Sequence, residues 1–341
     1  MHPCRFLVGA RVTAAAFALA ILLAPVALTA QDPALAAVPR AATATTPAIR
    51  VTLLGTGTPQ PIMARFGPSI LVEAGSEKLV IDAGRGALQR LRQLGVPYAD
   101  ITAVLLTHLH SDHVVGLPDL WLTGWLVSRA SKPLELWGPA GTVEMASHLE
   151  AAFAFDRAIR VADDRAAESG GHIVAHDIGE QVVFDRNGVK VTAFLVDHGP
   201  VKPALGYRVD YAGHSVVLSG DTRPSPTLIR VARGTDLLVH EVALASADSV
   251  ATNAQMRGVI AHHSTPTQAG TVFTAVRPKL AVYSHIVLRG GASTADIVRL
   301  TRTTYNGPLV VGADLMRIDV DDAVTVEGNA LADAEVRTRA P

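Results

Sequence analysis

The sequence contains a single cysteine, Cys4, and this scarcity excludes several kinds of chemistry. Cys4 lies at the start of the chain, ahead of an apolar segment, so the remaining sequence can form no disulfide framework, thiolate metal site or cysteine nucleophile. An excess of either charge is also missing, because the formal net charge is −1. Nucleic-acid binders usually carry a basic excess, so this balance predicts no nucleic-acid partner. The absence of charge runs and heptad patterns argues against a fibre.

The first 36 residues have the order of a secretory signal. Arg5 and Arg11 precede the apolar stretch from Val12 to Ala30, and small residues follow. The A-x-A pattern at residues 34–36 predicts cleavage after Ala36, with cleavage after Ala30 as the second choice.

An uncleaved membrane anchor is the alternative, since about 18 apolar residues could just span a bilayer. Pro25 interrupts that stretch, and we therefore expect no stable anchor. The expected location is the periplasm or the medium outside the cell.

The rest of the chain reads as one folded domain with short flanks. Residues 37–48 are small and proline-containing and read as a linker, residues 49–325 as the domain, and residues 326–341 as a C-terminal tail. Short strand-like runs such as IRVTLL and KLVIDA alternate with helical patterns such as GALQRLRQL, which ends at Gly95. Ser225 and Thr265, each followed by proline, fit helix N-caps. This alternation predicts a layered α/β protein.

Four potential metal ligands fall within six positions of the stretch LLTHLHSDHVVGLP. His108 and His110 are two apart on an extended segment, so their side chains point the same way and can bind one ion. Asp112 and His113 follow where the chain turns into a helix, and they can face a second ion. A solvated loop that happens to hold histidines is the alternative, and the density of ligand types argues against it.

A metal site predicts further ligands at the ends of other strands. His198 follows VTAFLVD, Asp221 follows HSVVLSG, and His285 follows KLAVYS. A lone histidine in such a position is more often a core residue. Three such residues together, in the same class of position, favour a shared metal centre.

The order HLHSDH, VDHG, SGDT and YSH resembles the metallo-β-lactamase superfamily of dinuclear metallohydrolases over nearly all of residues 50–320. The resemblance implies an αββα sandwich with the metals at one edge between the sheets. It implies two Zn²⁺ ions, with other divalent metals such as Mn²⁺ as alternatives. One ion would be held by His108, His110 and His198, the second by Asp112, His113 and His285, and Asp221 would bridge them. Asp82 in VIDAG matches a family aspartate that orients ligands.

Four further motifs are similar to the ribonuclease Z and arylsulfatase-like branch: LGTGTPQP, GYR, HEVA and HHST. In that branch, residues at the positions of Glu241 and His263 assist proton transfer to the leaving group. The resemblance therefore implies Glu241 and His263 as catalytic residues, together with the ligand Asp112. The residues alone also allow Glu241 to cap a helix and His263 to be a surface residue.

One departure from the branch shapes the expected substrate. Ribonuclease Z enzymes that mature transfer RNA carry an inserted arm after the GYR strand, whereas GYRVDY is followed here at once by AGHSVVLSGDT. With the secretory signal, this predicts an exported hydrolase that cleaves a small phosphodiester or aryl sulfate ester by attack of a metal-bridging hydroxide. Its partner would be a small-molecule ester rather than nucleic acid.

Several alternatives stay open on the sequence. A lactonase, a β-lactam hydrolase and a ribonuclease Z-type phosphodiesterase use the same fold, and a homodimer is compatible with the sequence. A non-catalytic binding protein is disfavoured because all seven ligand positions hold competent residues. Contact with substrate is a minor expectation for Arg65 and for four aromatic residues: Trp121, Trp125, Phe153 and Phe155.

Overall fold

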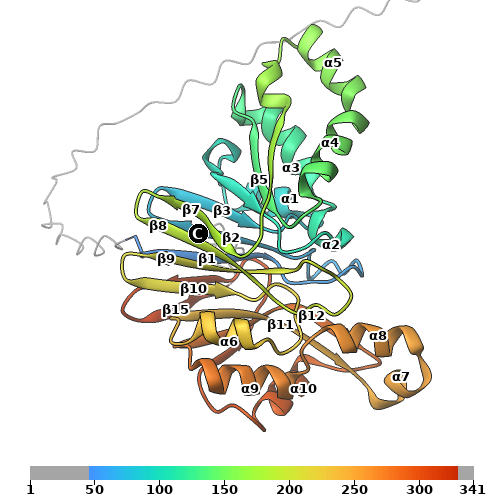
Figure 1. Cartoon of the computed structure of the whole chain (residues 1–341), viewed down its shortest axis with the longest axis vertical. Coiled ribbons are helices and arrows are strands. Elements are labelled where there is room, and N and C mark those ends of the chain that lie inside the picture. Colours follow the sequence, from blue (N-terminus) through green and yellow to red (C-terminus); the bar gives the residue numbers. More distant parts are fainter. Residues whose placement is uncertain (1–45, 329–341) are drawn as a thin grey trace, which may run out of the picture. The chain divides into compact units, whose positions relative to one another are not determined.

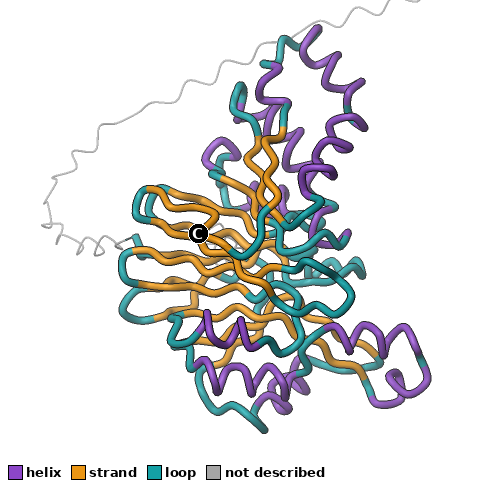
Figure 2. The backbone as a smooth tube through the Cα atoms, viewed as in Figure 1, coloured by secondary structure: helices purple, strands orange, loops and turns teal. Residues whose placement is uncertain are grey.

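The computed structural model describes residues 46–328, which form two stacked β-sheets covered by helices (Figures 1 and 2). The expected signal peptide, its cleavage sites, residues 37–45 of the linker and residues 329–341 of the tail lie outside the described residues. Within residues 46–328, no helix combines the length and apolar character needed to cross a bilayer.

The first sheet has eight strands. They are β1 Ile49–Gly55, β2 Ser69–Ala74, β3 Glu77–Ile81, β4 Ala103–Leu105, β5 Leu134–Gly138, β6 Ile173–Asp177, β14 Arg317–Val320 and β15 Val324–Glu327. Their order across the sheet is β15-β14-β1-β2-β3-β4-β5-β6, with parallel pairing from β3 to β6 and antiparallel pairing elsewhere. Val326 and Glu327, which the sequence placed in the tail, therefore belong to this sheet.

The second sheet has seven strands. They are β7 Gln181–Arg186, β8 Val189–Leu195, β9 Leu205–Tyr211, β10 His214–Leu218, β11 Leu237–Ala245, β12 Leu280–Arg289 and β13 Leu309–Val311. Their order is β13-β12-β11-β10-β9-β8-β7, with antiparallel pairing from β7 to β10 and parallel pairing from β10 to β13. Only Ala212 and Gly213 join β9 to β10, so the expected absence of an inserted arm at this point is confirmed.

Helices form the two outer layers. They are α1 Ala87–Gln93, α2 Ser111–Val114, α3 Leu117–Gly124, α4 Thr142–Ala152, α5 Ala154–Ala162, α6 Pro226–Ala232, α7 Ala247–Thr252, α8 Ala254–His262, α9 Pro266–Val276 and α10 Thr294–Thr301, with the short helices η1 Tyr98–Asp100, η2 Trp125–Arg129 and η3 Glu168–Gly171. The expected N-caps are confirmed, because Ser225 Oγ accepts from Leu228 N and Thr265 forms a capping box with Gln268.

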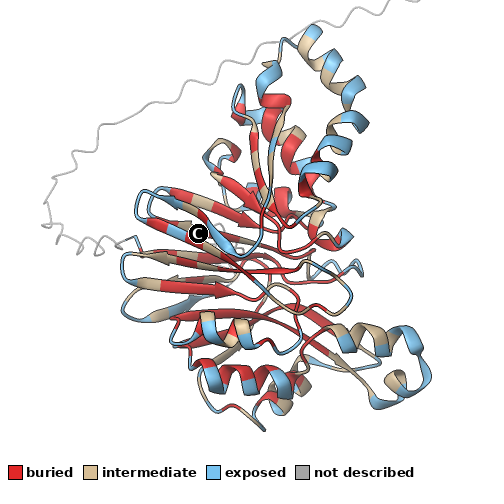
Figure 3. Cartoon of the chain, in the orientation of Figure 1, coloured by how far each residue is buried: buried red, intermediate tan, exposed pale blue. Residues whose placement is uncertain are grey.

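Alternation along each strand builds three apolar layers. In β1, Val51 and Leu53 face the second sheet, while Leu54 faces the helices on the other side. The layer outside the first sheet includes α1, α3 and α4, and the layer outside the second includes α6, α9 and α10. Buried residues run along both sheets, whereas no residue of α5 is buried (Figure 3). The expected αββα sandwich is confirmed.

Candidate metal centre

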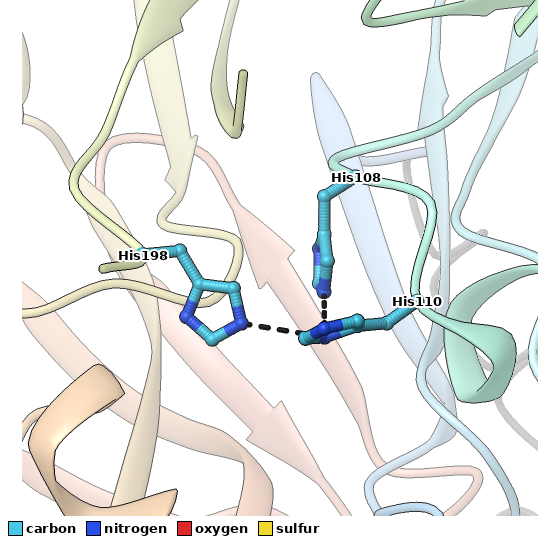
Figure 4. Close-up of side chains that lie close together, drawn as sticks. All are labelled: His108, His110 and His198. Atoms are coloured by element: carbon cyan, nitrogen blue, oxygen red, sulfur yellow. Dashed lines mark hydrogen bonds between the residues drawn. The ribbon is translucent and has the colours of Figure 1, made fainter. Parts of the chain in front are cut away.

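Three histidine side chains converge at one edge of the sandwich. His108 and His110 lie in the turn between β4 and α2, and His198 lies in the loop after β8. His108 Nε2 is 3.0 Å from His110 Nδ1, and His198 Nε2 is 3.4 Å from the same Nδ1 atom (Figure 4). Three ring nitrogens therefore face one point, which is the arrangement that a single cation requires.

A second group lies beside the first. Asp112 and His113 belong to α2, and His285 belongs to β12. Asp112 Oδ2 lies 3.3 Å from His285 Nε2 and 3.7 Å from His113 Nε2. The two sets that the family resemblance implies are thus both present, among overlapping groups that also include Asp221, Glu241 and His263.

Asp221 lies between the two groups and is only 3% exposed. Its Oδ2 atom is 3.3 Å from His285 Nε2 and 3.4 Å from His113 Nε2 in the second group. The same oxygen is 3.9 Å from Nε2 of both His108 and His198 in the first group. One carboxylate oxygen therefore faces both sets, as a bridging ligand must.

Gly220 allows this close approach of the two sheets. A Cβ atom at Gly220 would lie 2.5 Å from Leu205 O and 3.1 Å from Thr107 Cβ, and its φ is 59°. Thr107 precedes His108, so a side chain at Gly220 would push Asp221 away from the first motif.

Hydrogen bonds fix the ring orientations of three ligands. Nδ1 of His113 lies 2.8 Å from Asp82 Oδ2, and Nδ1 of His198 lies 3.0 Å from His262 O. Thr107 Oγ1 donates to Asp82 and lies 3.0 Å from His108 Nδ1. Donation from each Nδ1 leaves Nε2 with its lone pair toward the centre, the tautomer that metal binding needs.

The electrostatics of the centre suit cations. Burial lowers the pKa of His108 and of His198, which favours the neutral rings that bind metals. Burial alone would raise the pKa of Asp221, but His285 and His113 outweigh it and hold that pKa well below its usual range. Burial would likewise lower the pKa of His113, yet Asp221 and Asp82 raise it well above its usual range. Ionised carboxylates thus surround the ligand nitrogens.

An unpaired atom supports the same conclusion. Nε2 of His113 is buried and has no hydrogen-bond partner among residues 46–328. Buried polar atoms are nearly always satisfied, so an atom of this kind calls for an explanation. A cation between His113 and Asp221 would satisfy it, and a set of imidazole and carboxylate ligands suits zinc. The residues present therefore fit the divalent metals that the fold family implies.

A bulge in β12 delivers His285. The pairing of β11 with β12 shifts between His240 and Val242, so that Ser284 and His285 together oppose Glu241. His285 has a φ of 42°, in the left-handed region. Bulges re-aim side chains near active sites, and this one turns His285 toward Asp112 and Asp221.

The two residues expected to move protons are paired. Glu241 Oε2 lies 3.1 Å from His263 Nδ1, and Ser264 N donates to Glu241 Oε1 at 2.7 Å. Burial would lower the pKa of His263, but the charge and hydrogen bond of Glu241 outweigh it and raise the pKa to about 9. Glu241 is buried in β11 and caps no helix, and His263 is also buried rather than on the surface.

A cleft of about 150 Å³ opens over the ligands. The sequence reasoning missed several of its lining residues: Pro59, Val259, His262, Val287 and Arg289. Arg289 follows His285 by four positions on the same strand, and this even spacing could have indicated a shared face. Within residues 46–328, no carboxylate lies within ion-pair distance of Arg289.

The other proposed substrate contacts lie elsewhere. Arg65 donates to Thr56 Oγ1 at 2.6 Å and to Gly312 O at 2.7 Å, so it ties down its own loop instead of facing the cleft. Trp121 and Trp125 are buried in the core. Phe153 packs against Trp121, and Phe155 is 79% exposed, away from the residues that line the cleft.

Comparison with known proteins identifies relatives. Residues 77–286 match the family described as Beta-lactamase superfamily domain. Ribonuclease Z of Mycobacterium marinum is 38% identical over 275 residues, which cover 80% of this chain and 99% of that protein. Ribonuclease Z of Mycolicibacterium gilvum is 36% identical over 280 residues, which cover 81% of this chain and 98% of that protein.

Solved structures share the fold. Human tRNase Z, short form, aligns with a TM-score of 0.60 at 24% identity, covering 80% of this chain and 99% of that one. The metallo-β-lactamase fold protein YhfI from Bacillus subtilis aligns with a TM-score of 0.62 at 18% identity, covering 79% of this chain and 98% of that one. At these identities the likeness shows the fold alone.

Two expectations from the sequence were wrong. Relatives at 36–38% identity are named ribonuclease Z, which contradicts both a small phosphodiester or aryl sulfate as the main substrate and the absence of a nucleic-acid partner. The missing arm misled us, because this chain without an arm still matches a protein named ribonuclease Z over 99% of the length of that protein. Net charge misled us because it sums the whole chain and does not describe the cleft.

The family match and the near end-to-end relatives agree with the αββα fold of the structure. The chain belongs to the β-lactamase superfamily of metal-dependent hydrolases, in the branch of proteins named ribonuclease Z.

Proposed function

We propose that this protein is a metal-dependent phosphodiesterase that cleaves RNA in the manner of ribonuclease Z. The observation that carries the proposal is the identity of 38% to a protein of that name, over 80% of this chain and 99% of the relative. All the candidate ligands, together with Glu241 and His263, lie between residues 108 and 285, inside the main body of the fold.

The ligands have assigned roles in this proposal. His108, His110 and His198 would hold one divalent cation, Asp112, His113 and His285 a second, and Asp221 both. Zinc suits these nitrogen and oxygen ligands, and Mn²⁺ is the alternative. When bound, two such cations lower the pKa of a water molecule and offset negative charge on the phosphate.

Residues of the chain itself bind and orient the phosphodiester. Arg289 lines the cleft with Asp112, Asp221 and His285, and its guanidinium can pair with a phosphate oxygen. Its side chain is held at the rim by donation from Nη1 to Leu288 O at 2.9 Å. The guanidinium of Arg289 would therefore lie close to the scissile phosphate or to the neighbouring phosphate of the bound RNA.

His263 supplies the proton for the departing oxygen. Glu241 binds Nδ1, which leaves Nε2 as the nitrogen that can donate to substrate. A water-derived nucleophile adds to phosphorus, the bond to the 3′ oxygen breaks, and a proton passes from His263 to that oxygen. The products are a 3′ hydroxyl on one fragment and a 5′ phosphate on the other.

The location of this activity is a separate part of the proposal. Residues 1–36 have the composition of a secretory signal, so the enzyme would act outside the cytoplasm. The match covers 99% of the Mycobacterium marinum ribonuclease Z but only 80% of this chain, so the chain has room for the signal-like segment beside the catalytic domain.

A substrate panel tests the activity. The metal-loaded protein would be given a structured RNA with a single-stranded 3′ extension, such as a precursor transfer RNA, beside bis(p-nitrophenyl) phosphate and p-nitrophenyl sulfate. We expect the highest kcat/KM on the RNA. Turnover of the sulfate with no cleavage of RNA would reject the proposal.

A further inference from the structure

A buried carboxylate outside the metal centre binds three separate segments. Asp314, 4% exposed, lies in the connection from β13 to β14. Its Oδ1 accepts from Thr56 N and from Thr56 Oγ1, each at 2.9 Å. Its Oδ2 accepts from Phe66 N at 2.7 Å and from Arg90 Nη2 at 2.8 Å. One side chain thus fixes both ends of the loop that follows β1.

Thr56 connects Asp314 to the second sheet. It directly follows β1 of the first sheet, and its carbonyl oxygen accepts from Ile286 N, in β12 of the second sheet, at 2.9 Å. Ile286 is the residue after His285. A short chain of contacts therefore leads from Asp314 through Thr56 to the backbone beside a candidate ligand.

His285 needs such support. Its φ of 42° lies in the left-handed region, which is unfavourable for a residue other than glycine. Conformations of this kind persist only where the surroundings hold them. The bond from Ile286 N to Thr56 O holds the peptide that follows His285, at the point where the bulge would otherwise relax.

We propose that Asp314 is a positioning residue for the second metal subsite, the one formed by Asp112, His113 and His285. It touches none of these ligands and acts through Thr56 on the bulge in β12. Arg90, 8% exposed, neutralises the carboxylate, since an unpaired buried charge would be costly. The proposal rests on the metal centre of the proposed function and does not depend on which substrate is cleaved.

The test compares two aspartates. Asp314→Asn keeps the shape of the side chain and removes its charge. Asp319→Asn is the matched control. Asp319 lies in β14 and pairs with Arg50 of β1 through two contacts of 2.7 Å, and neither contact involves a candidate metal ligand. Metal-free protein is titrated with Zn²⁺ against a competing chelator, and amide exchange at Ile286 and Tm are measured in parallel.

For Asp314→Asn we expect one of two Zn²⁺ equivalents to bind about 10- to 100-fold more weakly, with the other unchanged and with faster exchange at Ile286. The control should keep both affinities even where its Tm falls. Unchanged binding of both equivalents by Asp314→Asn, or equal weakening of both, would overturn the proposal. Loss of RNA cleavage alone would bear on the proposed function instead.

A second variant covers the case in which Asp314→Asn does not fold. Thr56→Val keeps the backbone and the size of the side chain but removes two bonds of Oγ1, the one to Asp314 and the one from Arg65 Nη1. The bond from Thr56 N to Asp314 remains, so we expect the same selective weakening at a smaller size, about two- to tenfold. Parent affinities for both equivalents in folded Thr56→Val would overturn the proposal.

Discussion

Glu241 Oε2 lies 3.1 Å from Nδ1 of His263, and the other oxygen of the same carboxylate accepts from Ser264 N. The glutamate therefore fixes both the charge and the direction of the imidazole. Because Nδ1 is engaged, Nε2 is the nitrogen that remains for a substrate in the cleft that His263 lines.

His263→Ala should slow substrates with poor leaving groups far more than substrates with good ones. A general acid contributes about 10²- to 10⁴-fold when the leaving oxygen needs a proton. We expect a loss of that size on RNA and a small loss on bis(p-nitrophenyl) phosphate, since nitrophenolate departs without protonation. Equal losses in kcat/KM on both substrates, with metal content at the parent level, would rule out proton donation.

Glu241→Gln should move the alkaline limb of the pH–rate profile to lower pH. Glu241 helps to raise the pKa of His263 to about 9, and a proton donor loses activity as pH rises through its pKa. Removal of the negative charge lowers that pKa, while glutamine can still accept from Ser264 N. A profile of kcat/KM on RNA measures the shift, and an alkaline limb that stays in place would contradict the pairing.

Gly220→Ala should cost more than Gly213→Ala. Both glycines have positive φ, 59° and 85°, so alanine at either site costs about 1–2 kcal/mol for its backbone alone. A Cβ at Gly220 also meets Leu205 O at 2.5 Å, whereas one at Gly213 meets nothing within 4 Å. Urea denaturation gives both costs. Equal destabilisation would show that the close approach at Gly220 is unimportant.

Export predicts a shortened N-terminus. The signal-like segment from Val12 to Ala30 and the A-x-A pattern ending at Ala36 place the first residue of the exported chain near Ala37. N-terminal sequencing of protein from the fraction outside the cytoplasm checks this. An intact Met1 in a membrane fraction would favour the uncleaved anchor.

The sequence predicts the ligands well because each lies where an apolar strand ends. The spacing of His108 and His110, and the strands before His198 and Asp221, point to one edge of a layered fold without any knowledge of pairing. The outer helices follow from their caps, such as Thr265 with Gln268.

Long-range contacts lie beyond the same reasoning. The bulge at His285 depends on how β12 pairs with β11, and the partners of Asp314 lie more than 200 residues away in sequence. The bond from Arg65 to Gly312 O, which holds Arg65 away from the cleft, likewise cannot be read from its neighbours in the sequence. The substrate prediction was wrong because net charge describes the whole chain and the missing arm describes one loop. Neither of them describes the cleft.

The most direct test of the metal-dependent cleavage of RNA is one assay of an end-labelled precursor transfer RNA. Chelator-stripped parent protein and Asp221→Asn would each be incubated with it, with and without added Zn²⁺. We expect the parent to regain cleavage with Zn²⁺ and to leave a 3′ hydroxyl. Removal of a residue that only orients a metal ligand costs about 10- to 100-fold in activity. For Asp221→Asn we expect a larger loss of cleavage rate, because the carboxylate of Asp221 faces both ligand sets. Cleavage by the stripped parent, or equal rates for the two proteins with Zn²⁺, would contradict this account.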